Sequence, residues 1–142
     1  MLIIDNIEYK NVNWARDGLE QTADILNGDN SGRFQNTGDM FLDPIGTFFN
    51  NSGTLLRGPK CSDEEWDNLF MVLSDPLGEH LVSVPFNQGY LTTTIYISRA
   101  KRKLITQVNK RNKWAGSYSV TFTAMESQWR AGEELQGYTE GV

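Results

Sequence analysis

The chain has 142 residues, which suits one domain, because single hydrophobic cores usually occupy roughly 100–200 residues. Its 39% hydrophobic and 22% charged residues are typical of a folded globular protein and argue against a disordered one. The net charge of −5 argues against a general nucleic-acid-binding protein, so we do not expect nucleic acid as a partner.

The N-terminal residues reach the acidic Asp5 after three apolar side chains and contain no basic stretch, unlike a signal peptide. No apolar run approaches the ~20 residues that a transmembrane helix needs. The sequence therefore predicts a protein made in the cytoplasm, with no signal peptide, no transmembrane segment and no membrane partner.

The first elements are short and extended. Residues 2–4 and 7–9 favour β-strands, and Asp5-Asn6 between them tolerates positive φ, so we expect a β-hairpin. Residues 12–16 can extend the second strand.

The segment 19–26 fits either a helix or a strand, and the polar residues that follow it favour a strand. Residues 27–39 are rich in Gly, Asn, Asp and Ser, which predicts a long loop. We expect one or two short strands over 40–49, a turn at 50–53 and an opposing strand over 54–57.

A helix is predicted over 62–74. Ser62 and Glu65 form the two ends of a capping box, and acidic residues fill the first turn. Asp75-Pro76 ends the helix. One apolar stripe at helical spacing predicts the packing face, and its members are Trp66, Leu69, Phe70 and Leu73.

The C-terminal half favours strands. Residues 80–86 alternate in polarity, and residues 91–98 are dense in Thr, Ile and Tyr. We expect a last hairpin that joins 104–108 to 114–124 around residues 109–113. There is no internal repeat or linker, so the sequence predicts a mainly β (α+β), antiparallel domain over residues 1–130 and a loosely ordered tail over 131–142.

Few residues point to chemistry. The lone histidine, His80, has no serine or cysteine in a nucleophile setting, and Cys61 is best explained as a packing contact beside the helix cap. One cysteine also excludes an internal disulfide and a CxxC zinc motif. The acidic residues of the helix start are explained by capping, and Asp24–Asp29 lacks the order of a calcium loop. We therefore expect no catalytic, cofactor or metal site, no small-molecule substrate and no enzyme activity.

Charge is segregated along the chain. Residues 99–113 hold seven of the thirteen basic residues and no acidic one, whereas the rest holds six basic and eighteen acidic residues. The segment is either a solvated hairpin tip, a surface for an acidic partner such as a second copy, or a phosphate contact beside Trp114. Because the basic residues lie in a single segment, a protein partner is favoured over a phosphate contact.

Three motifs can be compared with known families: the helical Glu65–Phe70, H-x-V-x-x-P over His80–Pro85, and W-x-x-x-Y-x-V-x-F over Trp114–Phe122. In these motifs the chain resembles structural proteins of tailed bacteriophages and prophages, of the tail tube, distal tail and baseplate. The resemblance also extends to the N-terminal I-x-N-I-E-Y, so it spans nearly the whole chain.

That resemblance implies a split β-barrel or two-sheet sandwich with one flanking helix, located in a virion tail after synthesis. It also implies a homo-oligomeric ring and contacts with other tail proteins, through paired strand edges and the loops 27–39 and 99–113. The candidate interface residues are Arg99, Lys101, Arg102, Lys103, Lys110, Arg111, Lys113, Arg33 and Phe34. The alternative is a stand-alone carbohydrate- or nucleic-acid-binding β module that uses Trp14, Trp114 or Tyr118.

Overall fold

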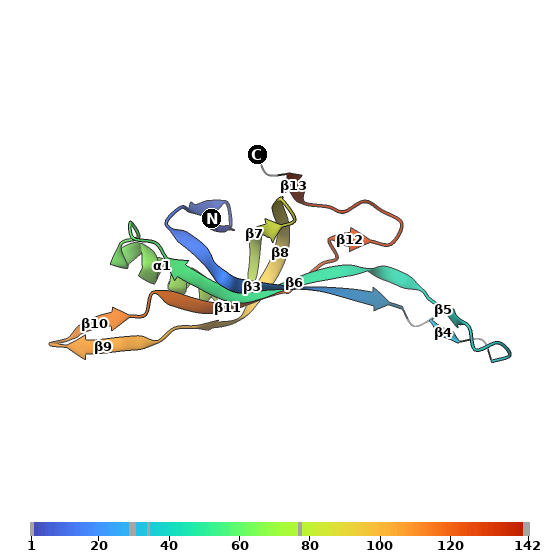
Figure 1. Cartoon of the computed structure of the whole chain (residues 1–142), viewed down its shortest axis with the longest axis horizontal. Coiled ribbons are helices and arrows are strands. Elements are labelled where there is room, and N and C mark those ends of the chain that lie inside the picture. Colours follow the sequence, from blue (N-terminus) through green and yellow to red (C-terminus); the bar gives the residue numbers. More distant parts are fainter. Residues whose placement is uncertain (1, 29–30, 34, 77, 141–142) are drawn as a thin grey trace.

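The computed structural model describes residues 2–28, 31–33, 35–76 and 78–140, without the side chain of Phe41 (Figure 1). Its strands are β1 (Leu2–Ile4), β2 (Ile7–Tyr9), β3 (Val12–Asn27), β4 (Gly32–Arg33), β5 (Met40–Phe41), β6 (Pro44–Arg57), β7 (Glu79–Phe86), β8 (Gly89–Lys101), β9 (Leu104–Val108), β10 (Arg111–Trp114), β11 (Ser117–Ala124), β12 (Trp129–Arg130) and β13 (Tyr138–Glu140). The helix α1 spans Asp63–Leu73.

The predicted fold class is confirmed: the protein is mainly β, antiparallel, and fits a β sandwich with one flanking helix. Nine strands form one large sheet in the order β12-β6-β11-β8-β7-β1-β2, with β3 added to β6 and β13 added to β8. Two small hairpins, β4–β5 and β9–β10, lie outside it. The alternating strand faces and the helix stripe meet in one core, whose largest fully buried side chains include Trp66, Tyr118, Phe122, Leu55 and Leu69.

The N-terminal hairpin is confirmed. Asp5 and Asn6 have φ values of 51° and 68°, the left-handed conformation that a two-residue turn requires. β1 pairs with β2 on one side and with β7 on the other, so the hairpin extends the large sheet.

The two longest strands, β3 and β6, pair with each other, which confirms the predicted strand over 19–26. The predicted turn at 50–53 is wrong. Residues Asn51–Gly53 lie inside β6 and pair with β3 on one side and with β11 on the other. Gly53 has a packing role instead, because a Cβ there would approach the Gly18 carbonyl oxygen of the β3 bulge to 2.2 Å.

The helix prediction is confirmed, with Ser62 as N-cap and Ser74 as C-cap. The Ser62 hydroxyl accepts a hydrogen bond from the Glu65 N–H at 3.1 Å, while the Glu65 carboxylate accepts one from Asn11. Trp66, on the predicted stripe, is 1% exposed.

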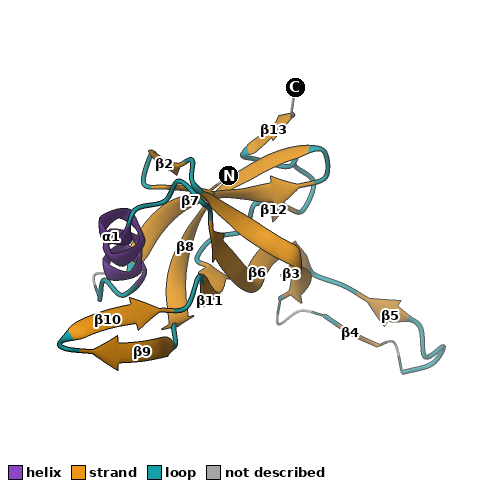
Figure 2. Ribbon diagram, turned by 60° about the vertical axis from the view of Figure 1, so that its left-hand side comes forward, coloured by secondary structure: helices purple, strands orange, loops and turns teal. Residues whose placement is uncertain are grey.

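Stacking fixes the position of α1. The Trp66 ring lies parallel to that of Tyr118 on β11, with centroids 3.8 Å apart, and its Nε1 donates to the Ala115 carbonyl. Phe70 meets Tyr118 edge-on. The helix is thereby held against β11 at the end of the molecule that carries β9–β10 (Figure 2).

The last hairpin differs from the prediction. β9 pairs with β10 around Asn109-Lys110, whose φ values of 50° and 66° make a tight turn. β11, which was predicted to form the second strand of this hairpin, pairs with β8 and β6 instead. The reason is that β11 carries the buried Tyr118, Val120 and Phe122, which belong to the core.

Residues 131–142 were expected to form a loose tail. Within the described part of that segment, β13 pairs with β8, and Leu135 packs against the core. Tyr138 also contacts Phe86 edge-on, with ring centroids 5.7 Å apart. This C-terminal segment therefore adds a strand to the sheet.

Candidate interaction surfaces

Two extensions project from opposite ends of the body (Figure 1). We call residues 20–45 the acidic arm; it comprises the second half of β3, the β4–β5 hairpin and the start of β6. We call residues 101–114 the basic hairpin; it comprises β9, β10 and the residues that lead into them. The acidic arm has five acidic residues and one basic residue, and the basic hairpin has six basic residues and no acidic one.

The acidic arm carries apolar side chains that the body does not cover. Ile25 is 71% exposed, and Leu26, Met40, Leu42 and Ile45 are each at least 45% exposed. An isolated exposed apolar side chain is ordinary, but a group of them on one projection is typical of a contact surface.

Of the two predicted interface residues in the 27–39 loop, Arg33 and Phe34, the structure describes Arg33. Arg33 lies in β4 and donates from Nη1 to the Gly38 carbonyl at 3.1 Å, so it supports the arm's own turn. Phe34 lies outside the described residues.

The basic hairpin combines charge with exposed apolar side chains. Lys101, Lys103, Lys110, Arg111 and Lys113 are exposed, as are Leu104, Ile105 and Val108. Arg99 is also exposed, but it lies in β8 opposite Thr121 of β11, away from the hairpin tip.

Arg102 has a structural role that the sequence did not indicate. Its guanidinium carbon lies 4.1 Å from the Phe70 ring centroid and 3.9 Å from that of Trp114. Its Nη1 is also 3.9 Å from Asp67 Oδ1. The cation–π contact with Phe70 and the weak ion pair with Asp67 therefore fasten the hairpin to α1, while the contact with Trp114 lies within the hairpin.

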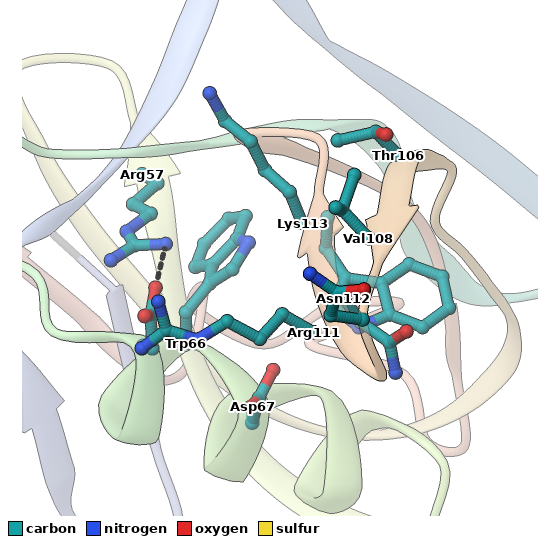
Figure 3. Close-up of a pocket in the computed structure, with 11 residues that line it drawn as sticks. Arg57, Trp66, Asp67, Thr106, Val108, Arg111, Asn112 and Lys113 are labelled. Atoms are coloured by element: carbon teal, nitrogen blue, oxygen red, sulfur yellow. Dashed lines mark ion pairs between the residues drawn. The ribbon is translucent and has the colours of Figure 1, made fainter.

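A groove of about 1020 Å³ lies between α1 and the basic hairpin (Figure 3). Its lining residues are Arg57, Asp63, Trp66, Asp67, Thr106, Val108, Asn109, Arg111, Asn112, Lys113 and Trp114. The Arg111 side chain extends from β10 over α1 (Figure 3). The groove thus joins a helix and a hairpin that lie about forty residues apart in the sequence.

The unmatched charge of the groove is positive. Arg57 pairs with Asp63 at 2.8 Å and also donates to the Cys61 carbonyl, and Asp67 faces Arg102. Among the described residues, Arg111 and Lys113 have no ion-pair partner. The two cations are thus free to meet an acidic partner.

A second, shallower depression of about 290 Å³ lies at the base of the acidic arm. Ile25, Leu26, Phe48 and Ala124 supply its apolar lining, beside Asp24 and Asn50. The Asn50 amide donates to the Asp24 carboxylate and ties this part of β3 to β6.

His80, the lone histidine, is 5% exposed and joins the N-terminal hairpin to β7. Its Nδ1 lies 2.7 Å from Asp5 Oδ2, and Asp5 Oδ1 accepts from the Leu81 N–H. Burial disfavours ionisation of Asp5, but the hydrogen bonds with His80 and Leu81 outweigh it and lower the pKa of Asp5. The Asp5–His80 pair thereby holds the turn of the N-terminal hairpin against β7.

The Cys61 thiol and the Tyr118 hydroxyl are buried and take part in packing contacts. Burial, reinforced by the Glu65 carboxylate, raises the pKa of the Cys61 thiol, which disfavours the nucleophilic thiolate. Burial raises the pKa of Tyr118 to about 12, so its hydroxyl stays protonated and donates to the Trp66 carbonyl at 2.7 Å.

Within the described residues, no group of three or more His, Cys, Asp or Glu side chains is placed to bind a metal ion. The helix in this part of the chain is neither long nor apolar enough to cross a membrane.

Comparisons of the chain with protein-family models, curated proteins and solved structures gave no match. Sequence patterns had identified the basic segment but missed the groove and the apolar part of the acidic arm. A signal for the arm is present in Asp39-Met40-Phe41-Leu42-Asp43, where two acidic residues bracket three apolar ones.

Proposed function

We propose that this protein is a non-catalytic structural component of a bacteriophage or prophage tail, which self-associates and contacts other tail proteins. The observation that carries the proposal is the pair of projections with opposite charge at opposite ends of one body (Figure 1). Head-to-tail association requires two different, complementary surfaces on each copy. An acidic arm and a basic hairpin meet that requirement.

The apolar side chains on both projections add to the argument. Ile25 and Met40 on the arm and Val108 on the hairpin are each more than half exposed. Burial of such side chains provides binding free energy, while the charges increase the association rate and select the partner.

An open strand edge supports association further. In the described structure, β3 pairs along residues 19–27 with β6 only, so its other edge carries backbone groups that another strand can pair with. The exposed, charged Glu20 on this strand disfavours indiscriminate pairing.

Light scattering coupled to size-exclusion chromatography tests the proposal. We expect oligomers at high protein concentration and low salt, and their dissociation as salt screens the complementary charges. Electron microscopy of the largest fraction is expected to show rings or short tubes. A strict monomer under all these conditions contradicts self-association.

A carbohydrate- or nucleic-acid-binding module is the second candidate, because Asn109, Asn112 and Lys113 lie beside Trp114 in the groove. The aromatic faces argue against it. Arg102 lies over the Trp114 ring, and Tyr118 lies over the Trp66 ring. A tryptophan fluorescence titration with oligonucleotides and glycans separates the candidates, since saturable quenching supports binding of these ligands.

A further inference from the structure

We infer that the groove between α1 and the basic hairpin binds residues 39–43 of the acidic arm of a second copy of this chain. The inference rests on the proposed self-association and assigns to it one binding site and one occupant. It depends on the shape and unmatched charge of the groove and on the exposed residues of the arm.

The groove offers apolar contacts below and positive charge at its rim. The exposed Val108 and the half-buried Trp114 supply these contacts from the hairpin side, while Trp66 on the helix side is buried beneath them. Arg111 and Lys113 provide the cations, which no described acidic residue neutralises. The volume of about 1020 Å³ is sufficient for several side chains of an extended segment.

Residues 39–43 of the arm match these properties. Met40 is 56% exposed and Leu42 is 55% exposed, so both are free to enter an apolar groove. Asp39 and Asp43 flank them in sequence; Asp39 is exposed and can approach the two cations, whereas Asp43 is half-buried. β5 supplies extended backbone at Met40–Phe41, already paired with β4, so binding of this part requires little ordering.

The positions of the two surfaces make binding within one copy geometrically unfavourable. The β4–β5 hairpin and the β9–β10 hairpin lie at opposite ends of the longest axis (Figure 1). The arm of one copy therefore reaches the groove of the next, and repetition of this contact builds a ring or a filament.

Disulfide trapping between two variants tests this contact. One protein carries Met40→Cys and the other Lys113→Cys, and the two are mixed under mild oxidation at low salt. We expect at least about tenfold more cross-linked heterodimer than in a matched mixture of Met40→Cys with Glu8→Cys, because a specific contact raises the local concentration of one thiol near the other. Glu8 is exposed on β2, away from both projections.

The native thiol does not interfere, because Cys61 is 5% exposed and burial raises its pKa. Mass spectrometry of the cross-linked peptide verifies the bridge. If both mixtures yield equal heterodimer while light scattering shows oligomers, this inference is overturned and the proposed self-association stands. If the chain is also monomeric throughout, both are overturned.

Discussion

The basic hairpin and the acidic arm are both two-stranded projections, but the body supports them differently. In the basic hairpin, the Arg102 side chain lies between the rings of Phe70 on α1 and Trp114 on β10. The helix is in turn held in place by the stacking of Trp66 on Tyr118. The distal β4–β5 part of the acidic arm belongs to a separate small sheet, and its Met40 is more than half exposed. In the proposed self-association, the basic-hairpin end would serve as a pre-organised receptor and the acidic arm as its extended ligand.

This difference predicts where mutations act. Changes beneath the basic hairpin should lower the stability of the fold, whereas changes on the acidic arm should weaken association and leave the fold intact.

Trp66→Ala removes the side chain that positions α1 beneath the hairpin. We expect a loss of about 3–5 kcal/mol in the free energy of unfolding, because a buried indole is replaced by a cavity. Chemical denaturation measures this loss. Met71→Ala on the exposed side of the same helix is the control and should change stability by less than about 0.5 kcal/mol. Equal stability of the two variants contradicts a helix packed through Trp66.

Arg102→Ala removes both cation–π contacts that hold the basic hairpin. We expect a loss of about 1–2 kcal/mol in stability. Hydrogen exchange of the β9–β10 amides should accelerate by about tenfold, while exchange in β7 changes little. Lys103→Ala, its exposed neighbour, is the control. Unchanged exchange in β9–β10 would show that the hairpin does not depend on this anchor.

Stability should fall in acid through Asp5. Its pKa is lowered from the ordinary 3.8 by the hydrogen bonds with His80 and Leu81, so its ionised form stabilises the folded protein above that pH. The contribution is lost as the pH falls below 3.8 through the lowered folded value. Asp5→Ala should flatten this part of the stability profile relative to wild type, measured by denaturation between pH 2 and pH 6. If the stability of wild type and of Asp5→Ala falls in parallel as the pH is lowered, Asp5 is not the source of this acid dependence.

Ile25→Ser changes an exposed residue of the acidic arm. We expect a stability change within about 0.5 kcal/mol, because the side chain is 71% exposed. Self-association should nonetheless weaken, as measured by sedimentation equilibrium. A clear loss of stability without any change in association would contradict the view that the acidic arm serves association and contributes little to the fold.

Local patterns predicted the elements whose residues decide their own conformation. Asp5-Asn6 indicated a turn, Ser62 with the Trp66 stripe indicated a helix, and the alternation from His80 to Phe86 indicated a strand; all three are confirmed. These features depend on neighbours within a few residues, so sequence suffices.

Features decided by distant partners were missed. Asn50-Asn51-Ser52-Gly53 has turn composition, but two flanking strands satisfy its backbone groups and keep it extended. The stacking of Arg102 on Phe70 joins residues 32 positions apart, which no local pattern reveals. The sequence therefore indicated Arg111, Lys113 and Trp114 on the hairpin side and Trp66 on the helix, but not that they line one groove.

The proposed association joins the arm of one copy to the hairpin end of the next. Its most direct test mixes an arm variant, Asp39→Lys with Leu42→Ser, and a hairpin variant, Arg111→Glu with Lys113→Glu. Each alone retains only one functional surface and should remain monomeric. Their equimolar mixture should form a heterodimer, detected by light scattering, because one intact hairpin can still bind one intact arm. A mixture that stays monomeric under conditions where wild type associates, or variants that associate alone as wild type does, would contradict the account.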